Sequence, residues 1–105
     1  MPFISTKNIK LYYESAGHGE AVLYISGTGG DLRKSPSVFD NDLKNNFHLI
    51  SYDQRGLGQS ETPDGPYTMK DYADDAFNFL IKLGFERVNI IGVSFGGMVA
   101  QHLAI

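Results

Sequence analysis

The residues best suited to chemistry form the segment Gly92-Val93-Ser94-Phe95-Gly96, which fits the pattern G-x-S-x-G. A mostly apolar run, Val88–Ile91, precedes this segment, and a helical pattern over Met98–Ile105 follows it. On a sharp turn from a strand into a helix, a serine is held in a strained conformation that exposes its hydroxyl. We therefore predict that Ser94 is a nucleophile that attacks carbonyl carbon.

The neighbours of Ser94 support this interpretation. A Cβ two positions to either side would collide within the turn, so we expect Gly92 and Gly96 to shape it. The backbone N–H of Phe95 would lie at the positive end of the following helix, where it could donate to a developing oxyanion. A chance glycine-rich turn is the alternative, and the flanking strand and helix, together with Gly97, favour the nucleophile.

Apolar patterning predicts the strands that must position this turn. Five short strands are expected, over Phe3–Thr6, Ile9–Glu14, Ala21–Ile25, Phe47–Tyr52 and Val88–Ile91. The first two are expected to form a hairpin around Lys7-Asn8. The third is apolar throughout, which is typical of a strand buried on both faces.

Helix signals lie between these strands. One helix is expected over residues 36–46. The clearest helix has Thr68 as its N-cap, Asp71 in the capping-box position and Gly84 at its end. Because strands alternate with helices, we predict an α/β fold with a mostly parallel sheet that carries helices on both faces.

Three segments, in order and spacing, resemble the α/β-hydrolase superfamily over nearly the whole chain. Ser26-Gly27-Thr28-Gly29-Gly30 is similar to the family's oxyanion loop, and Asp53–Ser60 is similar to its D-x-R-G-x-G-x-S loop. Gly92–Gly96 resembles its nucleophile elbow. The resemblance implies that residues 1–105 form the N-terminal part of an α/β-hydrolase domain, with the C-terminal part missing.

The resemblance also implies roles for the residues of the oxyanion loop. Backbone N–H groups of Thr28 and Phe95 would form the oxyanion hole, and such donors each stabilise a transition state by about 3–4 kcal/mol. Gly27 would shape the loop. Ser26 stands where histidine is common in the family.

The resemblance further implies a substrate class. Asp53 and Arg55 would brace their loop through hydrogen bonds or a salt bridge. A serine at the elbow argues against dehalogenase and epoxide-hydrolase chemistry, because those relatives have aspartate there. Esters, lactones, thioesters and activated amides remain, hydrolysed through an acyl-enzyme, together with lyase or perhydrolysis variants. Gly27–Phe39 and Gly65-Pro66-Tyr67-Thr68 resemble esterase and enol-lactonase-like members.

The remaining triad residues are not identifiable. The family order is serine, acid, histidine, yet after Ser94 the chain holds only His102 and no Asp or Glu. At 1.5 Å per residue, His102 would lie about 12 Å from the elbow along the helix. His18 and His48 are expected at the opposite end of the strands. We therefore predict that the 105-residue chain alone is inactive or nearly so.

The last residues, Leu103-Ala104-Ile105, carry no helix stop signal, so we expect the chain to be truncated within that helix. The strand over Val88–Ile91 would then be an exposed edge, and the chain would self-associate. A monodisperse monomer in sedimentation would contradict that expectation.

Other classes of function fit less well. A P-loop that ends at Lys34-Ser35 would need glycine at position 33, where the chain has Arg33. A dinucleotide fingerprint that starts at Gly27 would need glycine or alanine at position 32, where the chain has Leu32. No nucleotide cofactor is therefore expected. A non-catalytic binding protein on the same fold remains the alternative to an enzyme. The net charge of −3 and the absence of cysteine give no reason to expect nucleic acid, an anionic membrane, a thiolate metal site or disulfides. With no signal-peptide pattern, a cytoplasmic location is expected.

Overall fold

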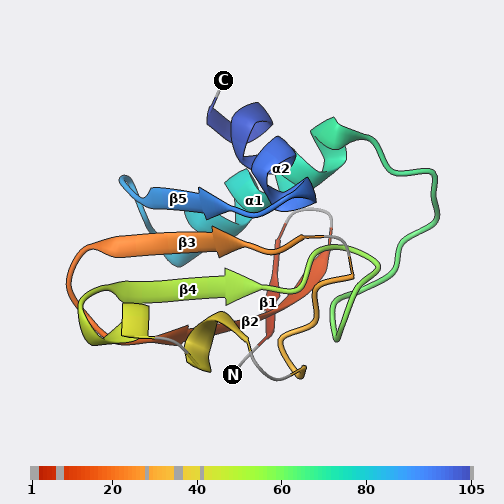
Figure 1. Ribbon diagram of the computed structural model, residues 1–105. Helices are drawn as coiled ribbons and strands as arrows, with labels where there is room; N and C mark the ends of the chain where they lie inside the picture. Colours follow the sequence, from red (N-terminus) through yellow and green to blue (C-terminus); the bar gives the residue numbers. More distant parts are fainter. Residues whose placement is uncertain (1–2, 7–8, 28, 35–36, 41, 105) are drawn as a thin grey trace.

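The computed structural model describes residues 3–6, 9–27, 29–34, 37–40 and 42–104 and contains a five-stranded mixed sheet (Figure 1). The strand order is β1-β2-β4-β3-β5. The strands are β1 (Phe3–Ser5), β2 (Lys10–Ala16), β3 (Ala21–Ile25), β4 (His48–Tyr52) and β5 (Asn89–Gly92). β1, β2 and β4 pair antiparallel, whereas β4, β3 and β5 run parallel. The predicted α/β class is confirmed, and the hairpin turn at Lys7-Asn8 lies outside the described residues.

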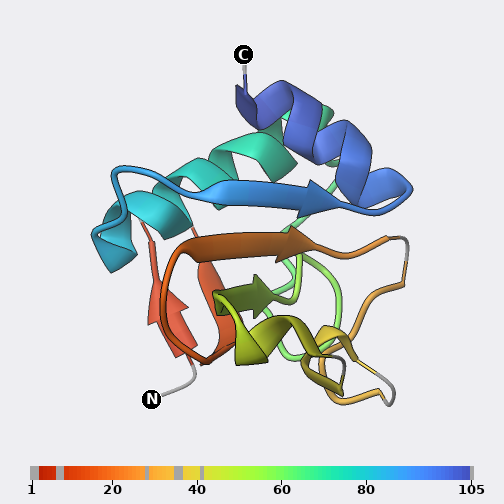
Figure 2. The same cartoon turned by 60° about the vertical axis from the view of Figure 1, so that its left-hand side comes forward.

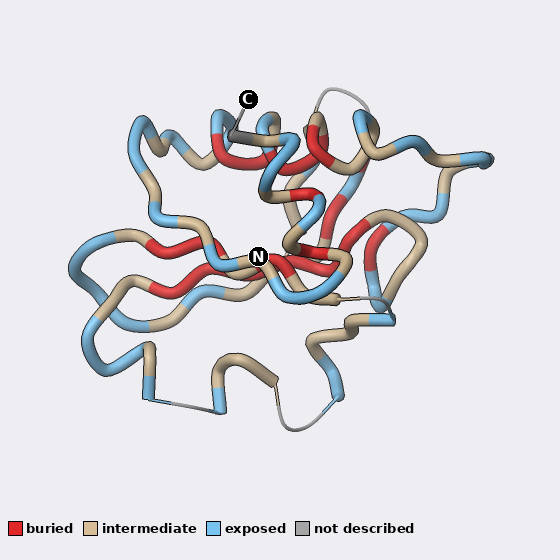
Figure 3. The backbone as a smooth tube through the Cα atoms, turned by 45° about the horizontal axis from the view of Figure 1, so that its top comes forward, coloured by how far each residue is buried: buried red, intermediate tan, exposed pale blue. Residues whose placement is uncertain are grey.

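Helices cover the two faces of the sheet unequally. Helices α1 (Met69–Leu83) and α2 (Phe95–Ala104) lie on one face, and the short 3-10 helices η1 (Val38–Asp40) and η2 (Asp42–Asn45) lie on the other (Figure 2). Buried residues gather along the strands and on the sides of the helices that face them (Figure 3).

The main core lies between the sheet and the two α-helices. Leu23 and Ile50, partners in the β3–β4 register, point to this side and pack with Phe79 and Val99. Val22 is buried on the opposite face, at 3% exposed. β3 is therefore buried on both faces, as its unbroken apolar run predicts.

Helix α1 has the predicted boundaries. Thr68 Oγ1 accepts a hydrogen bond from the Asp71 N–H at 3.1 Å, and Asp71 Oδ2 accepts one from the Thr68 N–H at 2.8 Å. The capping box is thus complete, and the Thr68 N–H lowers the pKa of the Asp71 carboxyl. Gly84 ends the helix with a left-handed φ of 87°.

Two helix predictions need correction. In place of one α-helix over residues 36–46, the described residues form η1 and η2. Ser37 and Asp40 cap the start of η1, since the Ser37 N–H donates to Asp40 Oδ2 at 2.7 Å and the Phe39 N–H donates to Ser37 Oγ at 3.2 Å. The Asp40 N–H then donates to the Ser37 carbonyl oxygen, three residues back, at 3.0 Å, which is the 3-10 pattern and not the α-helical one. The last helix begins at Phe95, three residues earlier than predicted, because it starts directly from the turn at Ser94. Within the described residues, no helix is long and apolar enough to cross a membrane.

Candidate active site

Ser94 occupies the turn between β5 and α2 with a strained backbone. Its φ is 54°, and among the described residues it is the one non-glycine with positive φ. The Ser94 carbonyl accepts from the Gly97 N–H at 2.9 Å and from the Met98 N–H at 3.4 Å, so the first turn of α2 closes on it. The residue is exposed. A strained, exposed serine at a helix N-terminus can present its hydroxyl to a substrate.

Steric limits explain the glycines of this turn. A Cβ on Gly92 would lie 2.5 Å from the Gly96 carbonyl oxygen, and a Cβ on Gly96 would lie 2.1 Å from the Ile25 carbonyl oxygen at the end of β3. Both distances are far below van der Waals contact. By contrast, a Cβ on Gly97 would lie 3.5 Å from the Gly92 carbonyl oxygen, an ordinary contact.

The loop after β3 lies directly beside Ser94. A Cβ on Gly27 would be 3.4 Å from the Ser94 Cβ, so the loop backbone passes close to the candidate nucleophile. Thr28, the predicted oxyanion donor of this loop, lies outside the described residues. The Phe95 N–H, the other predicted donor, has no hydrogen-bond acceptor among the described residues and remains available to a ligand.

Asp53 holds together the loops that follow β3 and β4. It is 1% exposed, and its Oδ1 accepts from the Leu32 N–H at 2.8 Å while Oδ2 accepts from the Gln59 N–H at 2.9 Å. Burial raises the pKa of this carboxyl, and the two N–H donors oppose that rise. Gly58, at φ 52°, passes so close that a Cβ there would be 2.2 Å from Asp53 Oδ2. Asp53 thus acts inside the loop structure, where both of its oxygens are occupied.

Arg55 forms a two-bond ion pair with Asp75 of α1. Its Nε lies 2.7 Å from Asp75 Oδ2 and its second guanidinium nitrogen lies 2.8 Å from Oδ1. The guanidinium carbon also lies over the Tyr67 ring, 5.1 Å from the ring centroid. Burial raises the pKa of the Asp75 carboxyl, and the Arg55 hydrogen bonds oppose the rise. Asp75 was not predicted from the sequence. It lies among Tyr72, Ala76 and Phe79, the apolar side of α1, and a carboxylate at such a position indicates a buried partner.

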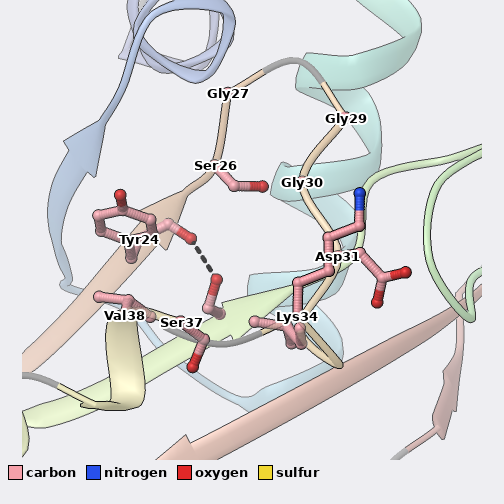
Figure 4. A pocket seen from close by; sticks show the side chains of 11 residues that line it. Tyr24, Ser26, Gly27, Gly29, Gly30, Asp31, Lys34, Ser37 and Val38 are labelled. Atoms are coloured by element: carbon pink, nitrogen blue, oxygen red, sulfur yellow. Dashed lines mark hydrogen bonds between the residues drawn. The ribbon is translucent and has the colours of Figure 1, made fainter.

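Two cavities lie beside the elbow and its loop. A cavity of about 210 Å³ adjoins Phe95 and has mostly apolar and aromatic walls, formed by Gly29, Arg55, Gly56, Leu57, Tyr67, Tyr72 and Phe95. A more polar cavity of about 260 Å³ lies under the loop after β3, where the Ser26 side chain points inward and Lys34, Ser37 and Val38 line the opposite wall (Figure 4). The cavity at Phe95 offers space for a small apolar group next to the candidate oxyanion donor.

None of the three histidines is placed at the elbow. His48 begins β4 opposite Ala21, at the far end of the parallel strands. The centroid of its ring lies 5.7 Å from the centroid of the Phe85 ring. His18 lies in the connection between β2 and β3, at that same far end. His102 lies on α2, with Nδ1 3.3 Å from the Met98 carbonyl oxygen. Among the described residues, no group of His, Cys, Asp or Glu side chains could hold a metal ion.

Comparison with known proteins gives the class. The sequence profile of the α/β hydrolase fold matches residues 20–105. A Synechocystis protein named for non-heme chloroperoxidase activity is 30% identical over 112 residues, which cover 98% of this chain and 40% of that protein. The crystal structure of the enol-lactonase from Burkholderia xenovorans is 32% identical with a TM-score of 0.86, covering 98% of this chain and 41% of that one.

A third match widens the range of reactions among the relatives. A Bacillus megaterium epoxide hydrolase is 25% identical with a TM-score of 0.84, covering 97% of this chain and 36% of that one. The chain therefore belongs to the α/β hydrolase fold family, and it matches the N-terminal part of that fold. It spans about two fifths of the length of the relatives it matches.

Proposed function

We propose that this chain supplies the nucleophile and the oxyanion elements of a serine hydrolase that acts on esters, lactones or related carbonyl compounds. The observation that carries the proposal is the left-handed backbone of Ser94, set between two glycines that admit no Cβ. The Phe95 N–H beside it has no acceptor in the part of the chain that the structure describes, so it supplies a donor of the kind that such a reaction needs.

In the proposed reaction, Ser94 Oγ attacks the substrate carbonyl carbon while a general base takes its proton. Charge develops on the carbonyl oxygen, which accepts hydrogen bonds from the Phe95 N–H and the Thr28 N–H. The intermediate then collapses, the leaving oxygen takes the proton, and an ester of Ser94 remains. Water, deprotonated by the same base, attacks that ester and releases the acid.

The general base is proposed to belong to a full-length protein that continues past Ile105. His18 and His48 lie at the wrong end of the sheet, and His102 lies about two turns along α2. The 105-residue chain alone is therefore proposed to be nearly inactive, with a free β5 edge through which copies can associate.

The walls of the cavity beside Phe95 favour the binding of small, neutral substrate groups. Tyr67, Tyr72 and Phe95 give it aromatic walls. Among the described residues that line it, the one cation, Arg55, is already paired with Asp75. The similarity to a solved enol-lactonase agrees with a small lactone or ester.

Hydrolysis of p-nitrophenyl acetate tests the proposal. In the full-length protein, Ser94→Ala is expected to reduce turnover by several orders of magnitude, because it removes the oxygen proposed to form the acyl-enzyme. Ser15→Ala, an exposed position on β2, is the matched control and leaves turnover unchanged. Turnover that survives Ser94→Ala would point instead to a binding protein with adventitious activity. Ser94-dependent turnover by the 105-residue chain alone would contradict its proposed inactivity.

A further inference from the structure

We infer that Gln54 is a positioning residue that fixes the start of the loop after β3, the segment from Ser26 to Leu32 that contains the predicted oxyanion loop. The inference rests on the proposed function and assigns a role to a residue outside the predicted site. Gln54 is the second residue after β4 and is 1% exposed. Its hydrogen-bond partner, Ser26, lies 28 residues away in the sequence, so no local pattern indicates the role of Gln54.

The side-chain amide of Gln54 is oriented by its partner. Its Nε2 donates a hydrogen bond to the Ser26 carbonyl oxygen at 3.0 Å. Because a carbonyl oxygen only accepts, the NH₂ end of the amide must face it. The other end, Oε1, is buried and has no hydrogen-bond partner among the described residues. A buried acceptor without a partner is unfavourable, so packing alone would favour Leu or Met here. The donor bond to the loop is the feature that an apolar residue could not supply.

The Ser26 carbonyl lies where the oxyanion loop meets the elbow. A Cβ on Gly96 would be 2.5 Å from this oxygen, so the first turn of α2 packs against it on one side. Gln54 contacts it from the loop after β4. A shift of this carbonyl would therefore move the oxyanion loop relative to the Phe95 N–H.

The neighbouring residue, Asp53, holds the other end of the loop through the Leu32 N–H at 2.8 Å. Within the loop, the Gly30 N–H donates to the Gly27 carbonyl oxygen at 3.1 Å. Figure 4 shows the loop rising from Ser26 through Gly27 and returning through Gly29 and Gly30 to Asp31. Two adjacent buried side chains thus anchor the two ends of the loop, and Thr28 lies between these ends in the sequence.

Gln54→Glu in the full-length protein tests the inference through its pH profile. The introduced side chain has nearly the same shape. When protonated, its O–H can donate to the Ser26 carbonyl; when ionised, it has no donor and repels that oxygen. We expect the ratio of variant to wild-type kcat to fall as pH rises through the pKa of the introduced carboxyl. The fall should reach about 10- to 100-fold, the effect of misplacing a catalytic group by up to 1 Å, with KM nearly unchanged.

Gln54→Met is the matched variant, because it keeps the side-chain volume and has no donor at any pH. Its kcat should be reduced by a similar factor, and its ratio to wild type should not vary with pH. Should the Glu variant unfold at high pH, the Met variant alone decides the question. If both variants keep kcat within about twofold of wild type while their melting temperatures fall, Gln54 is only structural and the inference is wrong. Wild-type activity that survives Ser94→Ala would instead overturn the proposed function itself.

Discussion

The two α-helices begin in opposite ways. Helix α1 begins where the side chains of Thr68 and Asp71, three residues apart, cap each other's backbone. Helix α2 begins at Phe95, directly after Ser94, whose left-handed backbone is held by the contact of Gly96 with the end of β3. The first start depends on neighbours in the sequence, and the second depends on a distant strand. A turn that holds strain of about 1–3 kcal/mol must be held by surrounding structure, and here it is the turn proposed to carry the chemistry.

Replacing Gly96 with Ala tests this contrast most severely. The new Cβ would lie 2.1 Å from the Ile25 carbonyl oxygen and 2.5 Å from that of Ser26, so β3 and α2 must separate. We expect a loss of about 3 kcal/mol or more in the free energy of unfolding, measured by chemical denaturation.

Gly97→Ala is the control, one residue further along the same helix. Its Cβ meets only ordinary contacts, and alanine favours a helix over glycine by up to about 1 kcal/mol. Equal losses for the two substitutions would show that α2 is not held by its contact with β3.

A second test concerns the link between α1 and the loop after β4. Arg55→Met leaves Asp75, which is 3% exposed, as a buried carboxylate without its partner. The expected cost is about 3 kcal/mol near neutral pH. Arg33→Met is the control, because its pair with Asp31 lies at the surface, with 59% of the arginine side chain exposed, and its loss should be barely measurable.

The cost of Arg55→Met should depend on pH. Burial already raises the pKa of Asp75 above its ordinary value, and removal of Arg55 raises it further. A carboxyl whose folded-state pKa lies above its unfolded-state pKa favours folding at low pH, and this contribution is lost as pH rises through the folded-state pKa. Denaturation at about pH 5 and about pH 8 should therefore show the smaller cost at the lower pH. A cost that grows on acidification would refute the assignment to Asp75.

The smallest expected effect concerns the start of α1. Thr68→Ala removes the hydroxyl that accepts from the Asp71 N–H and should cost about 1 kcal/mol, with no change in kcat. Thr68→Ser, which keeps the hydroxyl, should stay close to wild type. A loss of kcat in the alanine variant at temperatures where it is folded would mean that the cap of α1 and the elbow are coupled.

The same contrast explains what the sequence reveals. Thr68 and Gly84 predict both ends of α1, because capping uses residues within one turn. The elbow is also readable, since its glycines and Ser94 are adjacent. The bonds from Gln54 to Ser26 and from Arg55 to Asp75 join residues 28 and 20 positions apart, and no local spacing encodes such pairs. The helix predicted over residues 36–46 is wrong even though Ser37 and Asp40 form a local cap, because the Asp40 N–H bonds to the carbonyl oxygen three residues back and the turn is 3-10.

If the elbow makes Ser94 a reactive nucleophile, its hydroxyl should react covalently with a phosphonylating reagent. The full-length protein would be treated with a fluorophosphonate and digested, and the modified peptide identified by mass spectrometry. We expect one adduct per chain, on Ser94, and none in the Ser94→Ala variant. A folded full-length protein whose Ser94 remains unlabelled, or whose label lies on another residue, would contradict this expectation.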